Sequence, residues 1–277
     1  MFTVAYLGPE HTNTHLAALK RFGRRGAYLH APTVDEVFHL VERRKAEYGV
    51  VPIENSLEGA VTRTLDRFIE FVDTPVTIQG EIQQPIRHYF ITARGIKPAC
   101  VKLVLSHPQA LAQCHRWLAQ HVPHAALKET NSTADAVSHV AQYPDARAAI
   151  GRLELAKEHQ MAAVAIPEER ENTTRFLVLG RGEPRRGRRN KTSILCALKD
   201  KPGALHDALM PFKKNRINLT KIESRPSKRK AWEYLFFIDV EGHEFEPRVR
   251  RALAALRRST SLLRILGSYP VTPARGG

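Results

Sequence analysis

The sequence has few cysteines and no long apolar run. Its three cysteines, an odd number at wide spacing, argue against a disulfide framework or a zinc site and are typical of a reducing compartment. No uninterrupted apolar stretch approaches the roughly 20 residues that a membrane helix needs. The opening residues, MFTVAYLGPE, lack the basic and apolar regions of a secretory signal. We therefore expect a cytoplasmic protein that does not bind a membrane.

Motifs for nucleotides, metals and redox cofactors are also lacking. No Walker loop and no G-x-G-x-x-G stretch occurs, which argues against nucleotide use. The 13 histidines show no H-E-x-x-H pattern or other ligand spacing. We therefore predict that the protein uses neither a metal ion nor an organic cofactor.

Positive charge is abundant, with a formal net charge of +15. A chain this basic can bind nucleic acid, an acidic surface or anionic small molecules. Basic residues gather at 181–191 and 248–264, but neither segment contains an RNP aromatic pair or a zinc finger. We favour a solvated basic surface over nucleic-acid binding.

Short apolar strands alternate with helical patterns over the first 180 residues. Strands are expected at 3–7, 48–53, 76–84, 88–92, 101–106, 126–130, 148–150, 162–166 and 175–179. Helices are expected after the first strand through about residue 22, at 33–44, at 107–121 and at 133–142, with a short helix between the strands at 148–150 and 162–166. We expect the strands at 76–84 and 88–92 to pair with each other, and the strand at 175–179 to complete the second block. Two such α/β blocks in series predict two lobes with mainly parallel sheets and a ligand cleft between them.

A different pattern begins after residue 180. Residues 181–190 (RGEPRRGRRN) lack apolar periodicity and are expected to be a linker. Beyond them the order is β-α-β-β-α-β, which is ferredoxin-like, with strands at 192–197, 217–224, 232–240 and 262–268 and helices at 203–214 and 247–259. The predicted domains are a catalytic region at 1–180, a linker at 181–190 and a regulatory domain at 191–277.

Small polar residues follow many of the expected strands, as in the segments 7–14, 51–59, 106–109 and 131–133. In open α/β sheets, ligands bind outside the carboxyl ends of the strands. Hydroxyls, amides and helix N-termini at this edge suit a carboxylate. Each segment alone is also what a helix cap or a turn requires. These residues by themselves predict only a small-anion site.

Several motifs resemble those of the prephenate dehydratase family, in the same order and spacing. They are VPIENS at 51–56 with Gly59 and TLD at 64–66, SHPQAL at 106–111, STA at 132–134 and NTTRF at 172–176. The resemblance implies an α/β fold whose two-lobed catalytic region is like the type II periplasmic binding proteins. It also implies decarboxylating dehydration of prephenate to phenylpyruvate, in phenylalanine biosynthesis, with Thr174 as the catalytic residue.

The chemistry of that reaction suits a site without cofactors. Loss of carbon dioxide and hydroxide makes the ring of prephenate aromatic, which drives the reaction. The Thr174 hydroxyl can donate a hydrogen bond or proton to the leaving oxygen, and because it is a weak acid, positioning and electrostatics carry most of the rate. The candidate substrate-binding residues are Thr12, Asn55, Ser56, Gln109, Ser132, Thr133, Arg175 and Phe176.

Three residues in these motifs have a structural role as an alternative to a role in binding or catalysis. Arg175 can bind a carboxylate bidentately, or its side chain can form a structural ion pair, and the sequence favours neither. For Glu54 a structural role is at least as well supported as a catalytic one, because its charge would repel a dianion. His107, before Pro108, favours a turn over a catalytic base.

The chain also departs from the family pattern. His11 replaces a glycine and Asn13 a large aromatic residue in the motif that begins at Gly8. If that glycine normally has a positive φ, His11 carries some strain. Arg152 after Gly151 puts a charge near a strand end, where the family more often has small residues. Arogenate as substrate, or a non-catalytic two-lobed small-anion-binding protein, are alternatives.

The segment from Lys191 onward resembles an ACT domain of the dehydratase type. The matching residues are KPGAL at 201–205, INLTKIESRP at 217–226 and WEY at 232–234. The resemblance implies an allosteric phenylalanine site between ACT domains of neighbouring subunits, and hence a homodimer or homotetramer. The implied site residues are Gly203, Ala204, Leu205, Asn218, Glu223, Ser224, Arg225 and Pro226. The alternative is that these residues only shape the βαββαβ core and its dimer contact.

Overall fold

The computed structural model describes residues 2–70, 74–167, 172–182, 186–199, 201–227 and 233–271. The chain forms two compact units. Unit 1 comprises Met1–Leu7, Ala17–Gln83 and Arg175–Gly277, and unit 2 comprises Gly8–Leu16 and Gln84–Thr174. The chain therefore passes from unit 2 back into unit 1 between Thr174 and Arg175.

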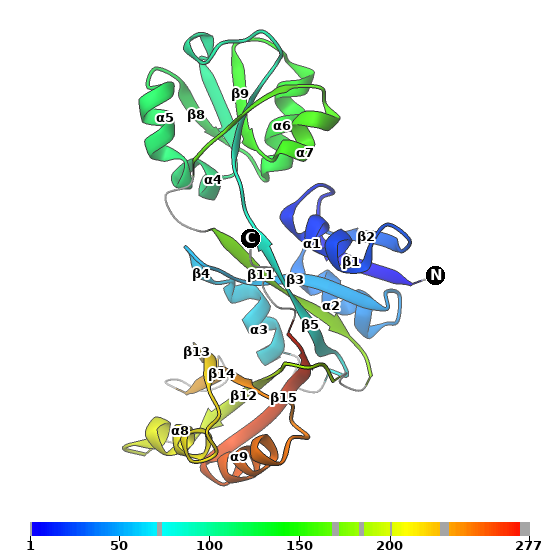
Figure 1. Cartoon of the computed structure of the whole chain (residues 1–277), viewed down its shortest axis with the longest axis vertical. Helices are drawn as coiled ribbons and strands as arrows, with labels where there is room; N and C mark the ends of the chain where they lie inside the picture. Colours follow the sequence, from blue (N-terminus) through cyan, green and yellow to red (C-terminus); the bar gives the residue numbers. More distant parts are fainter. Residues whose placement is uncertain are drawn as a thin grey trace. The chain divides into compact units, whose positions relative to one another are not determined.

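Unit 1 contains a six-stranded sheet in its N-terminal part, which we call sheet 1 (Figure 1). Its strands are β1 (Thr3–Leu7), β2 (Ala27–Ala31), β3 (Tyr48–Asn55), β4 (Gly59–Ala60), β5 (Thr77–Pro85) and β11 (Thr173–Gly180). Their order is β2-β1-β3-β11-β5, with β4 paired to β3, and β1 is parallel to both β2 and β3. The helices of this region are α1 (Asn13–Phe22), α2 (Val34–Glu42) and α3 (Thr62–Glu70).

Local signals set these helices. Thr33 caps α2, since its side chain accepts a hydrogen bond from the Glu36 backbone N–H at 3.2 Å. The apolar face of α2 is buried, with Val37 and Phe38 both inside the core. The helix lies within the range 33–44 that the sequence predicts. The strand β2 and the helix α3 were not predicted.

Unit 2 contains a second, five-stranded sheet, sheet 2, in the order β10-β6-β9-β7-β8. Its strands are β6 (Tyr89–Thr92), β7 (Leu103–Ser106), β8 (Ala126–Glu129), β9 (Arg147–Gly151) and β10 (Ala162–Ala165). Two apolar clusters, one with α4 (Pro108–Gln113) and α5 (His115–His121) and one with α6 (Thr133–Gln142) and α7 (Leu153–Glu158), flank this sheet (Figure 1). A short 3-10 helix covers Pro98–Cys100. Because β7 is parallel to β8 and to β9, the carboxyl ends of these three strands share one edge.

The structure corrects three predictions about the catalytic region. β5 does not pair with β6, since β5 belongs to sheet 1 and β6 to sheet 2. The predicted strand at 175–179 is not in the second block but lies between β3 and β5 as β11. The apolar residues 176–179 are at most 2% exposed. An apolar run of this kind indicates a strand that is buried on both faces, but it does not indicate which strands lie beside it. The helix predicted at 107–121 is two helices, α4 and α5, that meet at Cys114.

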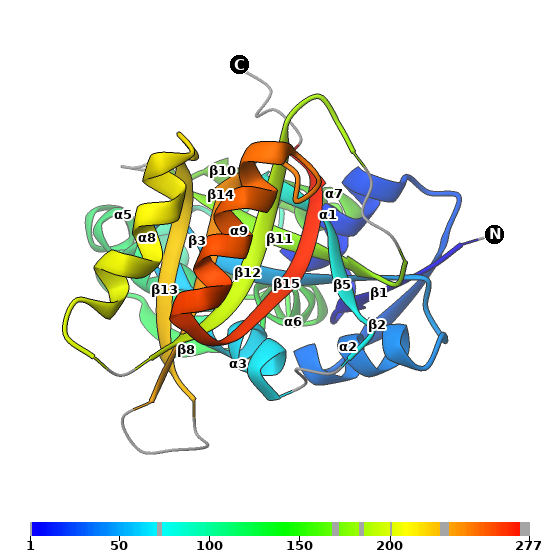
Figure 2. The same ribbon diagram turned by 90° about the horizontal axis from the view of Figure 1, so that it is seen from below.

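The C-terminal domain has the predicted β-α-β-β-α-β order. Its elements are β12 (Asn190–Leu198), α8 (Ala204–Lys214), β13 (Leu219–Pro226), β14 (Tyr234–Glu241), α9 (Pro247–Ser259) and β15 (Thr260–Pro270). The sheet is antiparallel in the order β13-β14-β12-β15, and α8 and α9 lie side by side on one of its faces (Figure 2). Its other face joins the core of unit 1 through Leu195, Phe237 and Tyr269. Trp232, the predicted start of a strand, and residues 183–185 of the linker lie outside the described residues.

Within the described ranges, every helix is too short or too polar to span a membrane. The three cysteines are free, with Cys100 exposed and Cys114 and Cys196 buried.

Candidate functional site

The NTTRF motif lies at the start of β11, where Thr174 stands between Asn172 and Arg175. The side chains of both these residues form hydrogen bonds. Asn172 is buried, donates to the Gln113 side chain at 2.8 Å and accepts the Ile86 backbone N–H at 2.8 Å. Thr174 is half-buried, and from Arg175 onward the strand is buried. The candidate catalytic hydroxyl is therefore on a backbone whose position is fixed on both sides.

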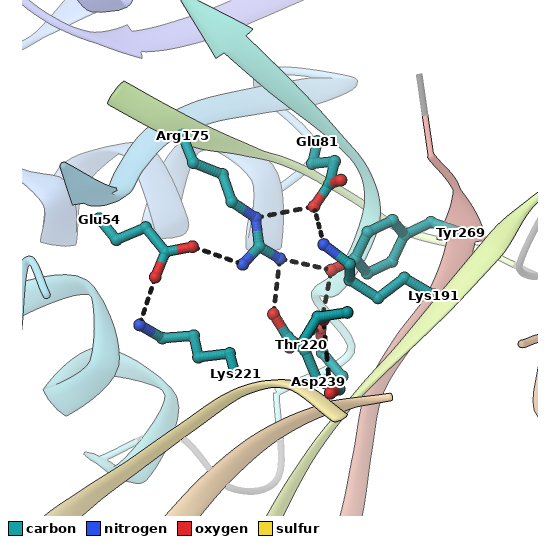
Figure 3. Close-up of polar contacts among 9 residues, drawn as sticks. Glu54, Glu81, Arg175, Lys191, Thr220, Lys221, Asp239 and Tyr269 are labelled. Atoms are coloured by element: carbon teal, nitrogen blue, oxygen red, sulfur yellow. Dashed lines mark hydrogen bonds and ion pairs between the residues drawn. The ribbon is translucent and has the colours of Figure 1, made fainter. Parts of the chain in front are cut away.

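Arg175 lies at the centre of a buried polar network in unit 1 (Figure 3). Its Nε donates to Glu81 Oε2 at 2.7 Å and its Nη1 to Glu54 Oε1 at 2.8 Å. Its Nη2 lies 2.7 Å from Asp239 Oδ2 and donates to the Tyr269 hydroxyl at 3.0 Å. The residue is only 7% exposed. Of the two alternatives for Arg175, the structure favours the structural ion pair over contact with substrate.

Two lysines complete this network. Lys191 Nζ donates to Glu81 Oε2 at 2.8 Å, and Lys221 Nζ lies 2.5 Å from Glu54 Oε2 (Figure 3). Three cations thus face three carboxylates: Arg175, Lys191 and Lys221 against Glu54, Glu81 and Asp239. We call these six residues, with Tyr269, the Arg175 network. Its balanced charge explains why so many ionised groups are tolerated in a buried place.

Arg175 and Glu54 are both held in their charged forms at neutral pH. Burial opposes the charge on Arg175, but Asp239, Tyr269 and Glu81 outweigh it and raise the pKa of the guanidinium. Burial also acts to raise the pKa of Glu54, yet the hydrogen bonds from Lys221 and Arg175 leave that pKa below its ordinary value. Glu54 is therefore a structural acceptor, as expected, although its donors are side chains rather than backbone N–H groups.

The remaining candidates in unit 1 are held by local contacts. Asn55 Oδ1 accepts the backbone N–H groups of Leu57 at 2.9 Å and Glu58 at 3.2 Å, which is an Asx turn after β3. Ser56 in that turn is exposed. Phe176 is 1% exposed and packs in an apolar cluster with Tyr6 and Val50. The ring is part of the core of unit 1, and its contact with substrate stays a prediction.

In unit 2, three candidates gather at the shared carboxyl edge of β7, β8 and β9. Gln109 is exposed on α4, directly after β7. Ser132 and Thr133 begin α6, directly after β8, and Ser132 Oγ accepts the Asp135 backbone N–H at 3.0 Å. His107 caps α4, with its Nδ1 accepting the Gln109 backbone N–H at 3.3 Å, as expected of a turn residue. The edge is built from helix starts, which suits an anion.

Thr12 also belongs to unit 2, in the segment that departs from the family pattern. Its Oγ1 accepts the His15 backbone N–H at 3.3 Å. His11 has a φ of 60°, so the replaced glycine position does need a left-handed backbone. The His11 backbone N–H donates to His15 Nδ1 at 2.9 Å, and its ring lies 3.3 Å from Glu158 Oε2. These contacts hold the residue in its strained conformation.

The candidate effector residues lie at two places in the C-terminal domain. Gly203 has a φ of 75° at the start of α8, followed by Ala204 and the 40% exposed Leu205. Along β13, Glu223 is half-buried, and Ser224 and Pro226 are exposed. Arg225 is paired to Asp66 of α3, whose Oδ1 lies 3.0 Å from its Nη2. Asn218 lies at the opposite end of β13 from Pro226.

No group of three His, Cys, Asp or Glu side chains in the described part of the chain is placed to hold a metal ion.

Comparison with known proteins decides the family. Residues 4–184 match the family model described as prephenate dehydratase, and residues 192–258 match the ACT domain. The chain belongs to the prephenate dehydratase family. The predicted family, fold class and hydro-lyase activity, that of a prephenate dehydratase, are confirmed. The domain boundaries predicted at 180 and 190 stay a prediction.

Curated relatives of this family cover nearly the whole chain. The bifunctional chorismate mutase/prephenate dehydratase of Aquifex aeolicus is 46% identical over 268 residues, which are 96% of this chain and 73% of that protein. The prephenate dehydratase of Methanocaldococcus jannaschii is 39% identical over 86% of both chains. Arogenate dehydratase 4 of Arabidopsis thaliana is 36% identical over 97% of this chain and 67% of its own length.

Solved structures of this fold agree over the full chain. The prephenate dehydratase of Arthrobacter aurescens in complex with L-Phe has a TM-score of 0.87 and 32% identity, covering 96% of this chain and 89% of its own. A chain described as GqqA, a novel type of quorum quenching acylase, has a TM-score of 0.85 and 26% identity, covering 98% of both chains.

Most residues of the Arg175 network were not predicted from the sequence. Glu81 lies inside the strand TIQGEIQQP and Asp239 inside YLFFIDVE. Asp239 follows the apolar run at 235–238, and an acidic residue in such a run is a signal of a buried ion pair, because a lone buried carboxylate is too costly. Glu81 lies among polar residues and carries no such signal. For Lys191 and Lys221, nothing in the sequence separates them from the other basic residues of this dehydratase.

Proposed function

We propose that this chain converts prephenate into phenylpyruvate with Thr174 as the catalytic hydroxyl, and that phenylalanine bound to its ACT domain regulates the reaction. The observation that carries the catalytic part is the NTTRF motif on β11, with Thr174 half-buried between the fixed residues Asn172 and Arg175. The free cysteines and the family's chemistry support a cytoplasmic location.

In the proposed reaction, the bond between the ring and its carboxylate breaks and releases carbon dioxide. The electron pair of that bond enters the ring, and the C–O bond at the opposite ring carbon breaks as hydroxide leaves. The Thr174 hydroxyl donates a hydrogen bond to the departing oxygen, which takes its proton from water. A threonine is too weak an acid to supply more, so holding the dianion in place contributes most of the acceleration.

We assign the binding of the substrate carboxylates and hydroxyl to Thr12, Asn55, Ser56, Gln109, Ser132 and Thr133. Arg175 has a different role in this proposal. Because its donors are occupied by Glu54, Glu81, Asp239 and Tyr269, it fixes the strand next to Thr174 and leaves the substrate to others.

For the effector, we propose a phenylalanine site that two ACT domains share in a homodimer, alone or as half of a homotetramer. β13 is an edge strand of its sheet, so its outer backbone groups are available for pairing. Its eight residues span about 26 Å, which separates Asn218 from Pro226 by more than the length of an amino acid. Antiparallel pairing of two β13 strands would bring the start of one beside the end of the other. The complex of the Arthrobacter aurescens relative with L-Phe supports phenylalanine as the ligand.

The deciding experiment mixes the purified protein with prephenate and follows aromatic product by absorbance. Thr174→Val should abolish turnover in a folded protein, and Thr174→Ser should keep part of it. Thr173→Val is the matched control, since its side chain points to the opposite face of β11, and it should stay within tenfold of the parent. A Thr174→Val protein as active as the parent would remove the catalytic assignment.

Arogenate is a second candidate substrate, because a relative 36% identical over nearly the whole chain is described as arogenate dehydratase. Running arogenate in parallel decides the preference by the ratio of the two kcat/KM values. Absence of turnover with both substrates would favour a non-catalytic binding protein.

A further inference from the structure

Arg152 is a buried arginine whose guanidinium has no hydrogen-bond acceptor among the described residues. It is 6% exposed, and its Nε, Nη1 and Nη2 all lack a partner in the described part of the chain. A guanidinium keeps its charge in proteins, and a buried charge is tolerated when an opposite charge pairs with it. Arg175 shows the usual solution, because all three of its nitrogens meet acceptors. Among the described residues, the Arg152 guanidinium therefore lacks the hydrogen-bonded carboxylate that its buried position calls for.

Arg152 lies at the same edge of unit 2 as the candidate substrate residues. It directly follows β9, whose carboxyl end shares an edge with those of β7 and β8. A Cβ added to the preceding Gly151 would lie 3.6 Å from the Thr133 backbone oxygen, so the end of β9 packs against the first turn of α6. The N–H groups of that first turn point out of the helix and favour an anion.

Arg152 stays charged, and the acidic residue that acts on it electrostatically, Glu154, does not accept a hydrogen bond from it. Burial lowers the pKa of Arg152 to about 10, with Glu154 acting against it, so the side chain stays charged at neutral pH. Glu154 is exposed and accepts no hydrogen bond from Arg152. Burial lowers the pKa of His15, as do His11 and Arg152, while Glu10 acts to raise it. His15 follows the candidate residue Thr12, so Arg152 acts electrostatically on the segment that departs from the family pattern.

We propose that Arg152 binds one carboxylate of the substrate dianion, together with the first turn of α6. This inference rests on the proposed function, because it takes prephenate as the ligand. A guanidinium can bind a carboxylate through two parallel hydrogen bonds, which adds orientation as well as affinity. Where the family more often has a small residue, this chain would hold its substrate with an additional cation.

The test measures binding of prephenate by calorimetry to the Thr174→Val protein, which should hold the substrate without consuming it. Adding Arg152→Gln should raise the Kd about tenfold to a hundredfold, the usual effect of a charged hydrogen bond. Arg152→Lys should recover part of that loss, because it restores the charge but not the bidentate geometry. Arg147→Gln, at the opposite end of β9 and paired with Asp145, is the control and should stay within twofold.

Thermal unfolding separates this role from a structural one. If Arg152 binds the substrate, Arg152→Met should leave the thermal unfolding midpoint of the ligand-free protein unchanged or raise it, since the variant removes an unpaired buried charge. A lowered midpoint with an unchanged Kd would overturn the inference.

The two proposals can fail separately. Normal turnover of prephenate with a Kd that does not depend on Arg152 overturns this inference alone. Absent turnover with a Kd that does depend on Arg152 leaves a carboxylate site and removes the enzyme assignment. No binding of prephenate to the Thr174→Val protein would overturn both.

Discussion

Arg175 and Asp239 form a buried ion pair between β11 and the ACT sheet, with Nη2 2.7 Å from Oδ2. Arg175 directly follows the proposed catalytic Thr174, and Asp239 lies in β14 at the middle of the ACT sheet. Ser193 of the neighbouring β12 donates to the other carboxylate oxygen of Asp239 at 2.5 Å. A shift of the ACT sheet would therefore act on the backbone next to Thr174 through a single side chain.

Replacing Arg175 by methionine should destabilise the protein strongly. The variant leaves Glu54, Glu81 and Asp239 without their shared cation, and an unpaired buried charge costs about 3–5 kcal/mol. Urea unfolding followed by circular dichroism measures the change. Arg63→Met is the control, because that arginine pairs with Asp35 and Glu70 at a side chain 48% exposed and should cost about 0–1 kcal/mol. Equal costs would show that the Arg175 network adds no special stability.

Glu54→Gln should make the stability of the protein less sensitive to acid. The hydrogen bonds from Lys221 and Arg175 hold the pKa of Glu54 below its ordinary value near 4.5. Its charged form therefore contributes stability that is present above that value and is lost as the pH falls through the lower, folded-state pKa. The unfolding free energy of the parent should fall between about pH 6 and pH 3 more steeply than that of the variant. Parallel curves would mean that Glu54 gains nothing from its two cations.

Lys221→Met should weaken the coupling between effector and substrate. Lys221 lies two residues before Glu223 on β13 and pairs with Glu54, which directly precedes Asn55. Coupling between sites commonly amounts to a 5–150-fold change in affinity. We expect the ratio of phenylalanine Kd values with and without substrate to move toward one. Lys199→Met, whose lysine bonds the exposed Arg258 carbonyl in the same domain, should keep the parent ratio.

Glu223→Ala tests the effector site itself. The variant should raise the Kd for phenylalanine in the free protein about tenfold, because it removes a charged hydrogen bond. Calorimetry measures this directly, and Lys221→Met should leave the same Kd within a few-fold. If phenylalanine binds the Glu223→Ala protein as tightly as the parent, the effector site lies elsewhere.

Local signals made much of the fold predictable from the sequence. Helices α6 (Thr133–Gln142) and α9 (Pro247–Ser259) cover the predicted residues, since capping and apolar spacing are properties of neighbouring residues. Strand partners are different, because they depend on residues far along the chain. The buried run of β11 pointed to an interior strand, yet it did not show that β3 and β5 are its neighbours.

The two missed elements have separate causes. β2 is an edge strand whose five residues are mostly exposed, so it lacks the alternation that marks a half-buried strand. Helix α3 does carry a helical signal, with Leu65, Phe68 and Ile69 buried on one face. That spacing is present in the sequence, so helix α3 was predictable from its apolar periodicity.

The sequence indicated which residues belong to the candidate site, but not which other residues their side chains contact. The sequence left two alternatives for Arg175, and only the positions of Glu81 and Asp239 in three dimensions favoured the ion pair. Phe176 lies two residues after Thr174, the proposed catalytic residue, but its ring packs in the core. The sequence shows Arg152 as an unusual charge, whereas only the folded structure shows that its guanidinium has no hydrogen-bond partner among the described residues.

Ser132→Asp separates the two roles of Ser132, which caps α6 and is also a candidate substrate residue. Aspartate is as good an N-cap as serine, so the unfolding free energy should change by less than about 0.5 kcal/mol. The added negative charge at the helix start should repel the substrate dianion and raise KM by about tenfold or more. Thr33→Asp makes the same change at the cap of α2, where Thr33 accepts the Glu36 backbone N–H, and should leave KM unchanged. If both variants keep the parent KM, Ser132 is a helix cap and nothing more, and the anion must bind away from the start of α6.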